Sequence, residues 1–156
     1  MKLYLVQHGE AKTKEEDPSR PLTDKGKAFS ERTACFAVGQ AQVSVGAVFH
    51  SNKSRARETA EIMAAYLWPV KGIKEEKDMQ PNDDPKIWEA RLSEMTEDVM
   101  LVGHLPHLSK LASVLLGDKD EKPVVEFKNS GIVCLRRDDV GQWLLSWVVT
   151  PDILGV

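Results

Sequence analysis

The chain alternates short apolar runs with longer amphipathic stretches, a pattern that predicts strands followed by helices. Apolar runs at 3–6, 45–49 and 99–102 are typical of strands that are buried on both faces of a sheet. After the second and third runs, apolar residues recur at the i, i+3, i+4 spacing of an amphipathic helix, over 59–67 and 108–116. These strands are therefore expected to lead into helices that cover the sheet.

Capping residues set the expected ends of two helices. The first helix is expected to begin after Thr23, whose hydroxyl is a suitable N-cap, with Phe29 and Phe36 on one face. Gly117 is the expected C-cap of the helix over 108–116. A further short helix is expected around three apolar residues, Trp88, Leu92 and Met95.

The rest of the chain predicts a loop and an antiparallel addition to the sheet. Residues 71–86 are charged and rich in turn-forming residues, so a long surface loop is expected there. Strands are expected at 124–127, 132–135 and 143–149, and the last two are joined by a hairpin-like turn at 138–141. The whole pattern predicts an α/β protein with a mostly parallel sheet flanked by helices and an antiparallel hairpin at its edge.

Composition narrows the class of protein. With 156 residues, 42% hydrophobic and 29% charged, the chain fits a single domain over 1–156. Its net charge of −3 lacks the basic excess of a nucleic-acid binder. No apolar stretch approaches the roughly 18 residues of a membrane helix, and the first apolar run is too short for a secretory signal, so a cytoplasmic protein with no membrane contact is expected. Cys35 and Cys134 are expected to be buried, reduced thiols.

Polar motifs with chemical potential follow each of the three buried strands. These motifs are Gln7-His8-Gly9, His50-Ser51-Asn52 and Gly103-His104. Ligands of open α/β sheets bind beyond the carboxyl ends of the strands, so the three motifs are expected to meet in one place. A single histidine at a strand end fits a packing role, but two of them next to glycines favour a functional site. The glycines are expected to leave room for a ligand beside each imidazole.

Two arginines give this expected site a preference for phosphate. Arg55 falls near the N-terminus of the second helix, where the backbone N–H groups already favour an anion. Arg20 lies in the polar loop after the first strand and can reach the same edge. Guanidinium groups match phosphate oxygens, and neutral imidazole is a competent nucleophile near pH 7. The pattern predicts phosphoryl transfer that requires neither a metal nor a cofactor.

The motifs also resemble a known family. Gln7-His8-Gly9-Glu10 resembles the Arg-His-Gly-Glu signature of the histidine phosphatase superfamily, also called phosphoglycerate-mutase-like. Residues 51–60 resemble its Ser-Pro-x-x-Arg-Ala-x-x-Thr-Ala segment, and 102–106 resemble its second histidine motif. Residues 19–23 and 147–151 are similar to the SixA-like branch, the phosphohistidine phosphatases.

This resemblance implies a three-layer sandwich fold and a covalent mechanism. By it, His8 becomes phosphorylated while Arg20, Arg55 and His104 hold the phosphoryl group, and water then releases phosphate. The other residues expected to bind the substrate phosphate are Gln7, Gly9 and Ser51. The substrate class that the branch suggests is a protein that carries phosphohistidine.

The chain departs from the family pattern in two places, and the general acid is open. Gln7 stands where the family has arginine, and the loss of one charged contact is expected to slow turnover by roughly 10²–10³. Asn52 replaces a proline, which affects loop stiffness more than chemistry. Asp78 and Glu10 are the weak candidates for a general acid. Phosphohistidine has a good leaving group, so the absence of a clear acid favours N–P over O–P substrates.

Three functions remain open on the sequence alone: a phosphatase for phosphohistidine on a protein, a phosphatase for small phosphoesters, and a phosphate-binding module whose catalysis is reduced by Gln7. His50 is expected to be a hydrogen-bonded or exposed histidine. His104 and His107 are three residues apart, but Pro106 between them and the lack of a third ligand argue against zinc.

Overall fold

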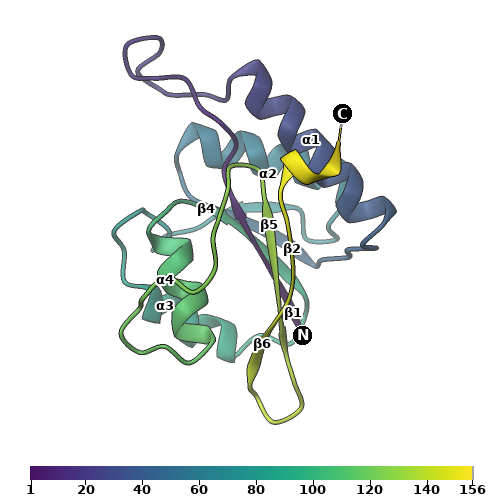
Figure 1. Cartoon of the computed structure of the whole chain (residues 1–156), viewed down its shortest axis with the longest axis vertical. Helices are drawn as coiled ribbons and strands as arrows, with labels where there is room; N and C mark the ends of the chain where they lie inside the picture. Colours follow the sequence, from purple (N-terminus) through teal and green to yellow (C-terminus); the bar gives the residue numbers. More distant parts are fainter. Residues whose placement is uncertain (156) are drawn as a thin grey trace.

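A mixed sheet forms the middle layer of the molecule, with strand order β3-β2-β4-β1-β5-β6 (Figure 1). This computed structural model describes residues 1–155. Its strands are β1 (Lys2–Gln7), β2 (Ala47–His50), β3 (Ile73–Glu75), β4 (Val99–Gly103), β5 (Ile132–Arg137) and β6 (Trp143–Val149). Its helices are α1 (Asp24–Gly39), α2 (Ser54–Leu67), α3 (Pro85–Ser93), α4 (His107–Leu115) and the 3₁₀ helix η1 (Pro151–Leu154).

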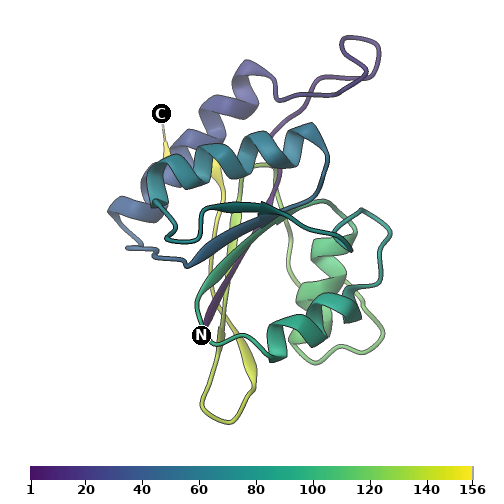
Figure 2. The same ribbon diagram turned by 180° about the vertical axis from the view of Figure 1, so that it is seen from behind.

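The helices cover both faces of this sheet. Figures 1 and 2 show α1 and α2 together on one side of the sheet and α3 and α4 together on the other. Strand β1 alternates between the two cores: Leu3 and Leu5 pack with α3 and α4, while Tyr4 and Val6 pack with α1 and α2. A strand that is apolar on both faces needs a helical layer on each side. The prediction of a three-layer α/β sandwich is confirmed.

Strand direction decides where the chemistry can gather. β1 pairs with β4, β4 with β2 and β2 with β3, all in parallel. β5 and β6 form the expected antiparallel hairpin, and β5 pairs with β1. Gln7 lies opposite Gly103, and His50 lies opposite Val102. The carboxyl ends of β1, β4 and β2 are therefore at the same edge of the sheet.

The expected helix caps are present. The Thr23 hydroxyl accepts a hydrogen bond from the Gly26 N–H and so caps α1. Gly117 follows the C-cap residue of α4 with a φ of +96°, the left-handed conformation that glycine adopts without strain. Between β1 and α1, the chain makes a long excursion away from the sheet (purple in Figure 1), and the pairing of Ala11 with Leu22 closes its base.

Three local predictions are wrong. Residues 124–127 form no strand: Val125 and Phe127 are buried against the α3–α4 core, but β1 already has β4 and β5 as neighbours, so no free strand edge lies beside this segment. The expected loop 71–86 contains β3, which is too short and too polar to show alternation. Cys134 is buried as expected, whereas Cys35 is exposed.

Candidate active site

The two histidines that follow β1 and β4 lie side by side. The ring centroids of His8 and His104 are 5.0 Å apart. The backbone continues the β1–β4 pairing to this point, because the His8 N–H donates to the Gly103 carbonyl at 3.1 Å. The sheet therefore brings together two residues that are 96 positions apart, and the register of β1 against β4 fixes their spacing.

The ring of His8 is held so that one nitrogen stays free. Its Nδ1 lies 2.7 Å from the carbonyl oxygen of Gly9. A carbonyl oxygen only accepts, so Nδ1 carries the proton and Nε2 carries the lone pair. The neighbouring backbone is fixed as well: the Gly9 N–H donates to Thr59 Oγ1 at 2.9 Å, and the Asn129 side-chain amide donates to the His8 carbonyl at 2.8 Å.

His104 is held from its other side. Its Nε2 lies 2.6 Å from the hydroxyl of Ser51, which is fully buried. Ser51 is the first residue after β2, so this bond joins the ends of β2 and β4. With Nε2 occupied, Nδ1 is the nitrogen of His104 that is left for a ligand. The next histidine, His50, is buried and donates from Nδ1 to the Ser51 carbonyl at 2.7 Å, which is the hydrogen-bonded role expected for it.

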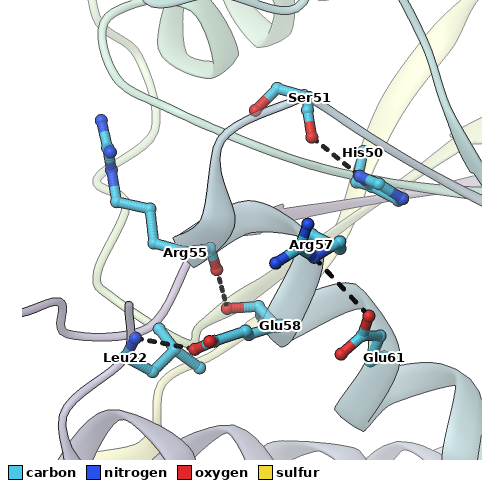
Figure 3. Close-up of polar contacts among 8 residues, drawn as sticks. Leu22, His50, Ser51, Arg55, Arg57, Glu58 and Glu61 are labelled. Carbon is cyan, nitrogen blue, oxygen red and sulfur yellow. Dashed lines mark hydrogen bonds and ion pairs between the residues drawn. The ribbon is translucent and has the colours of Figure 1, made fainter. Parts of the chain in front are cut away.

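Two guanidinium groups complete the cluster. Arg55 lies in the first turn of α2, and Figure 3 shows its side chain pointing away from Arg57, Glu58 and Glu61. Those carboxylates have other partners: Glu61 pairs with Arg57, and Glu58 accepts from the Leu22 N–H. Arg20 donates from Nε to the Lys12 carbonyl. After burial, the positive charges of Arg55 and Arg20 are smaller causes that lower the pKa of His8, so both charges lie on its side of the molecule.

Burial and charge keep both imidazoles neutral. Burial, opposed by the Gly9 carbonyl and aided by the charges of Arg55 and Arg20, lowers the pKa of His8 to about 4. Burial, followed by the charges of His8, Arg55 and Lys53, lowers the pKa of His104 to about 3. At pH 7 both rings are uncharged, and Nε2 of His8 is available for attack on phosphorus.

Gln7 is the last residue of β1 and directly precedes His8. Its side chain lines a cavity of about 520 Å³, together with residues of α1, η1 and the segment before β5. The Oε1 atom of Gln7 is buried, and it has no hydrogen-bond partner among residues 1–155. Asn129, which holds the His8 carbonyl, lines the same cavity. The cavity therefore adjoins the backbone that carries His8.

Neither candidate acid has a hydrogen bond to His8 or His104 in the described part of the chain. Glu10 is exposed, and its carboxylate accepts from the Thr23 hydroxyl at 3.2 Å. Burial lowers the pKa of His107, and the charge of Asp78 is among those that oppose this shift, so Asp78 lies on the side of His107. The charges that shift the pKa values of His8 and His104 include no carboxylate.

Gly9 has a different role from the one expected. A Cβ atom at Gly9 would lie 2.9 Å from both the Gly26 carbonyl oxygen and the Ser30 hydroxyl, so the glycine permits close packing against α1. A Cβ atom at Gly103 would meet only ordinary contacts, 3.6 Å from Leu108. At Gly9, the space that the missing side chain leaves is therefore filled by α1. At Gly103, the ordinary contacts do not support the expectation that the glycine leaves room for a ligand.

Sequence reasoning missed the supporting roles of Thr59 and Asn129. Thr59 was expected in the helical stripe of α2 and in the family-like segment 51–60, but its link to Gly9 depends on tertiary packing. Asn129 lies 121 residues from its partner His8, and no local pattern marks it.

His107 is fully buried, and within the described part of the chain neither of its ring nitrogens has a partner. In residues 1–155, no three His, Cys, Asp or Glu side chains are grouped to hold a metal ion, and no helix is long and apolar enough to cross a membrane.

Comparison with known proteins agrees with this geometry. The sequence profile of the histidine phosphatase superfamily (branch 1) matches residues 3–81, half of the chain. The chain belongs to this superfamily. It is therefore a phosphatase, a class of hydrolase. A search of curated proteins found no match.

Solved structures extend the likeness to the whole chain. The protein histidine phosphatase SixA in complex with tungstate is 26% identical, covers 99% of each chain and has a TM-score of 0.87. A protein from Agrobacterium tumefaciens, described as a phosphohistidine phosphatase SixA, is 23% identical over 96% of this chain and 97% of its own, with a TM-score of 0.78. The α-ribazole phosphatase from Shigella flexneri shares the fold at 16% identity, with 97% of each chain covered and a TM-score of 0.79.

Proposed function

We propose that this protein is a metal-independent phosphatase that removes the phosphoryl group from phosphohistidine on a protein, through a covalent intermediate on His8. The observation that carries the proposal is the pairing of His8 and His104 at 5.0 Å, with Nε2 of His8 left free by the contact of Nδ1 with the Gly9 carbonyl. The charges of Arg20 and Arg55, which act on His8, support it. A nucleophile and cationic groups in one place are what in-line phosphoryl transfer requires.

In the first step, Nε2 of His8 attacks the phosphorus atom. The new bond joins phosphorus to Nε2, and the bond from phosphorus to the substrate nitrogen breaks. Arg20 and Arg55 neutralise the equatorial oxygens, and Nδ1 of His104 is the nitrogen placed to hydrogen-bond one of them. In the second step, the oxygen of a water molecule attacks phosphorus, the bond to Nε2 breaks, and phosphate leaves with the protons of the water.

Two observations favour a phosphohistidine substrate. A phosphoimidazole that is protonated on its other nitrogen departs as neutral imidazole, so the enzyme does not need to donate a proton. This agrees with the charges that act on the two histidines, among which neither Glu10 nor Asp78 appears. The SixA likeness extends over 99% of each chain at 26% identity, and that protein is a protein histidine phosphatase.

The proposal also assigns roles to Gln7 and to the whole chain. Gln7 brings no charge to its position, so we expect turnover to be slower than with arginine there, by roughly 10²–10³. We expect the chain to act as one domain over 1–156, because residues of β1, β4 and β5 contribute to both cores.

A substrate panel tests the function. Phosphate release is measured from a phosphorylated histidine-transfer domain, from a sugar phosphate and from phosphoserine, with the His8→Ala variant as the control. The proposal expects turnover that is fastest on the phosphohistidine domain and absent in His8→Ala. Faster turnover of the sugar phosphate would identify a small-molecule phosphatase instead, and no turnover on any substrate would indicate a phosphate-binding module.

A further inference from the structure

Lys53 lies inside the segment that builds the site. It is the N-cap residue of α2, two residues after Ser51 and two before Arg55. Its backbone N–H donates to the Ser51 hydroxyl at 3.4 Å, and that hydroxyl is the partner of His104. The loop between β2 and α2 therefore carries the backbone of Lys53 next to the serine that holds the second histidine.

The ammonium group of Lys53 has no anionic partner among residues 1–155. Lys71 pairs with Glu97 and Lys128 pairs with Asp152, but Lys53 takes part in no ion pair or side-chain hydrogen bond there. The residue as a whole is half-buried. Burial is the main cause that lowers the pKa of His104, and the charge of Lys53 is a smaller one, after those of His8 and Arg55, so this charge is near the site.

The positive charge of Lys53 is relevant because residue 7 of this chain, Gln7, is neutral. The resembled family motif has arginine there, and this chain has a neutral glutamine beside its nucleophile. A phosphoryl group bound between His8 and His104 carries up to two negative charges near neutral pH, and charge-assisted contacts are about twice as strong as neutral ones. A cation on the α2 side of the site is suited to offset a part of that missing charge.

We propose that Lys53 is a phosphoryl-binding residue, and that it supplies the positive charge which Gln7 does not bring. The proposal deepens the phosphatase assignment and rests on its site. Lys53 stabilises the bound phosphoryl group together with Arg55, from the same helix N-terminus. Its contribution is greatest while position 7 is neutral, and it diminishes when an arginine stands there.

Binding of inorganic phosphate tests this proposal without requiring turnover. The dissociation constant is measured by isothermal titration calorimetry at pH 7.5 and fixed ionic strength, on the full chain. Lys53→Met is expected to weaken phosphate binding about 10-fold, in line with the loss of one charge-assisted contact. Lys53→Arg, which keeps the charge, is expected to bind within about 3-fold of wild type.

Two further variants make the result specific. Lys27→Met removes the same charge from an exposed position on α1, and it is expected to leave phosphate binding unchanged. In a Gln7→Arg background, Lys53→Met is expected to cost less than about 3-fold, because the new arginine takes over. The histidine ring signals in NMR spectra report whether each variant stays folded.

The outcomes separate this inference from the proposed function. Equal phosphate binding by Lys53→Met and Lys27→Met would overturn the role of Lys53. A full 10-fold loss in the Gln7→Arg background would overturn the compensation between the two positions. If phosphate binding follows the expected pattern but the wild-type protein turns over no substrate, the assignment of Lys53 holds and the phosphatase proposal fails.

Discussion

Replacing Thr59 by valine removes one hydrogen-bond group from the support of His8 while keeping the shape of the side chain. Thr59 is fully buried, accepts from the Gly9 N–H at 2.9 Å and donates to the Arg55 carbonyl at 2.8 Å. In the valine variant the Gly9 N–H is left buried without its partner. A buried donor that loses its acceptor costs about 1–3 kcal/mol.

A second threonine provides a matched control. Thr33 is also fully buried in a helix, and its hydroxyl donates to the carbonyls of Phe29 and Ser30, within α1 itself. Thr33→Val therefore loses a bond within its own helix, as Thr59→Val does, but no bond to the His8 loop. The difference between the two variants isolates the bond to Gly9.

The assay is urea unfolding together with steady-state kinetics. We expect Thr59→Val to reduce the free energy of unfolding by about 2 kcal/mol more than Thr33→Val, equivalent to a melting temperature lower by about 4–8 °C for a chain of this length. We also expect kcat/KM to fall by about 10–100-fold in Thr59→Val alone, because the Gly9 carbonyl orients the His8 ring. Equal losses of stability and activity in both variants would refute this reasoning.

Three other predictions concern charge in and around the site. Gln7→Arg is expected to raise kcat/KM by roughly 10²–10³, measured on the phosphohistidine domain, and an unchanged value contradicts the role given to position 7. The folded pKa values of His8 and His104, about 4 and 3, lie below the ordinary value of 6.5, so between pH 6.5 and 4 the unfolded chain binds more protons. The contribution of these two histidines to the free energy of unfolding is therefore fully present above pH 6.5 and is lost as the pH decreases through that window. Urea unfolding at pH 7 and pH 4.5 should show a smaller decrease in the free energy of unfolding for His8→Asn than for wild type. Asp78→Asn and Glu10→Gln are each expected to change kcat on phosphohistidine by less than about 3-fold, and a loss of 10-fold or more would identify a general acid.

The sequence was sufficient for the parts of the fold that depend on burial and strand order. β1, β2 and β4 are apolar on both faces, which predicts a sheet covered by helices, and their parallel order predicts that His8 and His104 meet. The N-cap at Thr23 and the hairpin of β5 and β6 could be predicted because they depend on residues that are close together in the sequence.

The parts that failed depend on tertiary contacts. Val125 and Phe127 have the apolar pattern of a strand, but that pattern reports burial, and no sheet edge is free beside them. Cys35 lies among apolar residues in the sequence, yet it falls on the exposed face of α1. Asn129 supports His8 across 121 residues, a relation that no spacing rule contains.

The central claim is that Nε2 of His8 carries the phosphoryl group during turnover. The direct measurement is acid-free rapid quenching of the enzyme with a ³²P-labelled phosphohistidine domain, followed by peptide mapping of the labelled protein. The account predicts a base-stable, acid-labile label on the peptide that contains His8, and none in His8→Ala. Turnover of the domain with no label on His8, or with the label retained in His8→Ala, would contradict it.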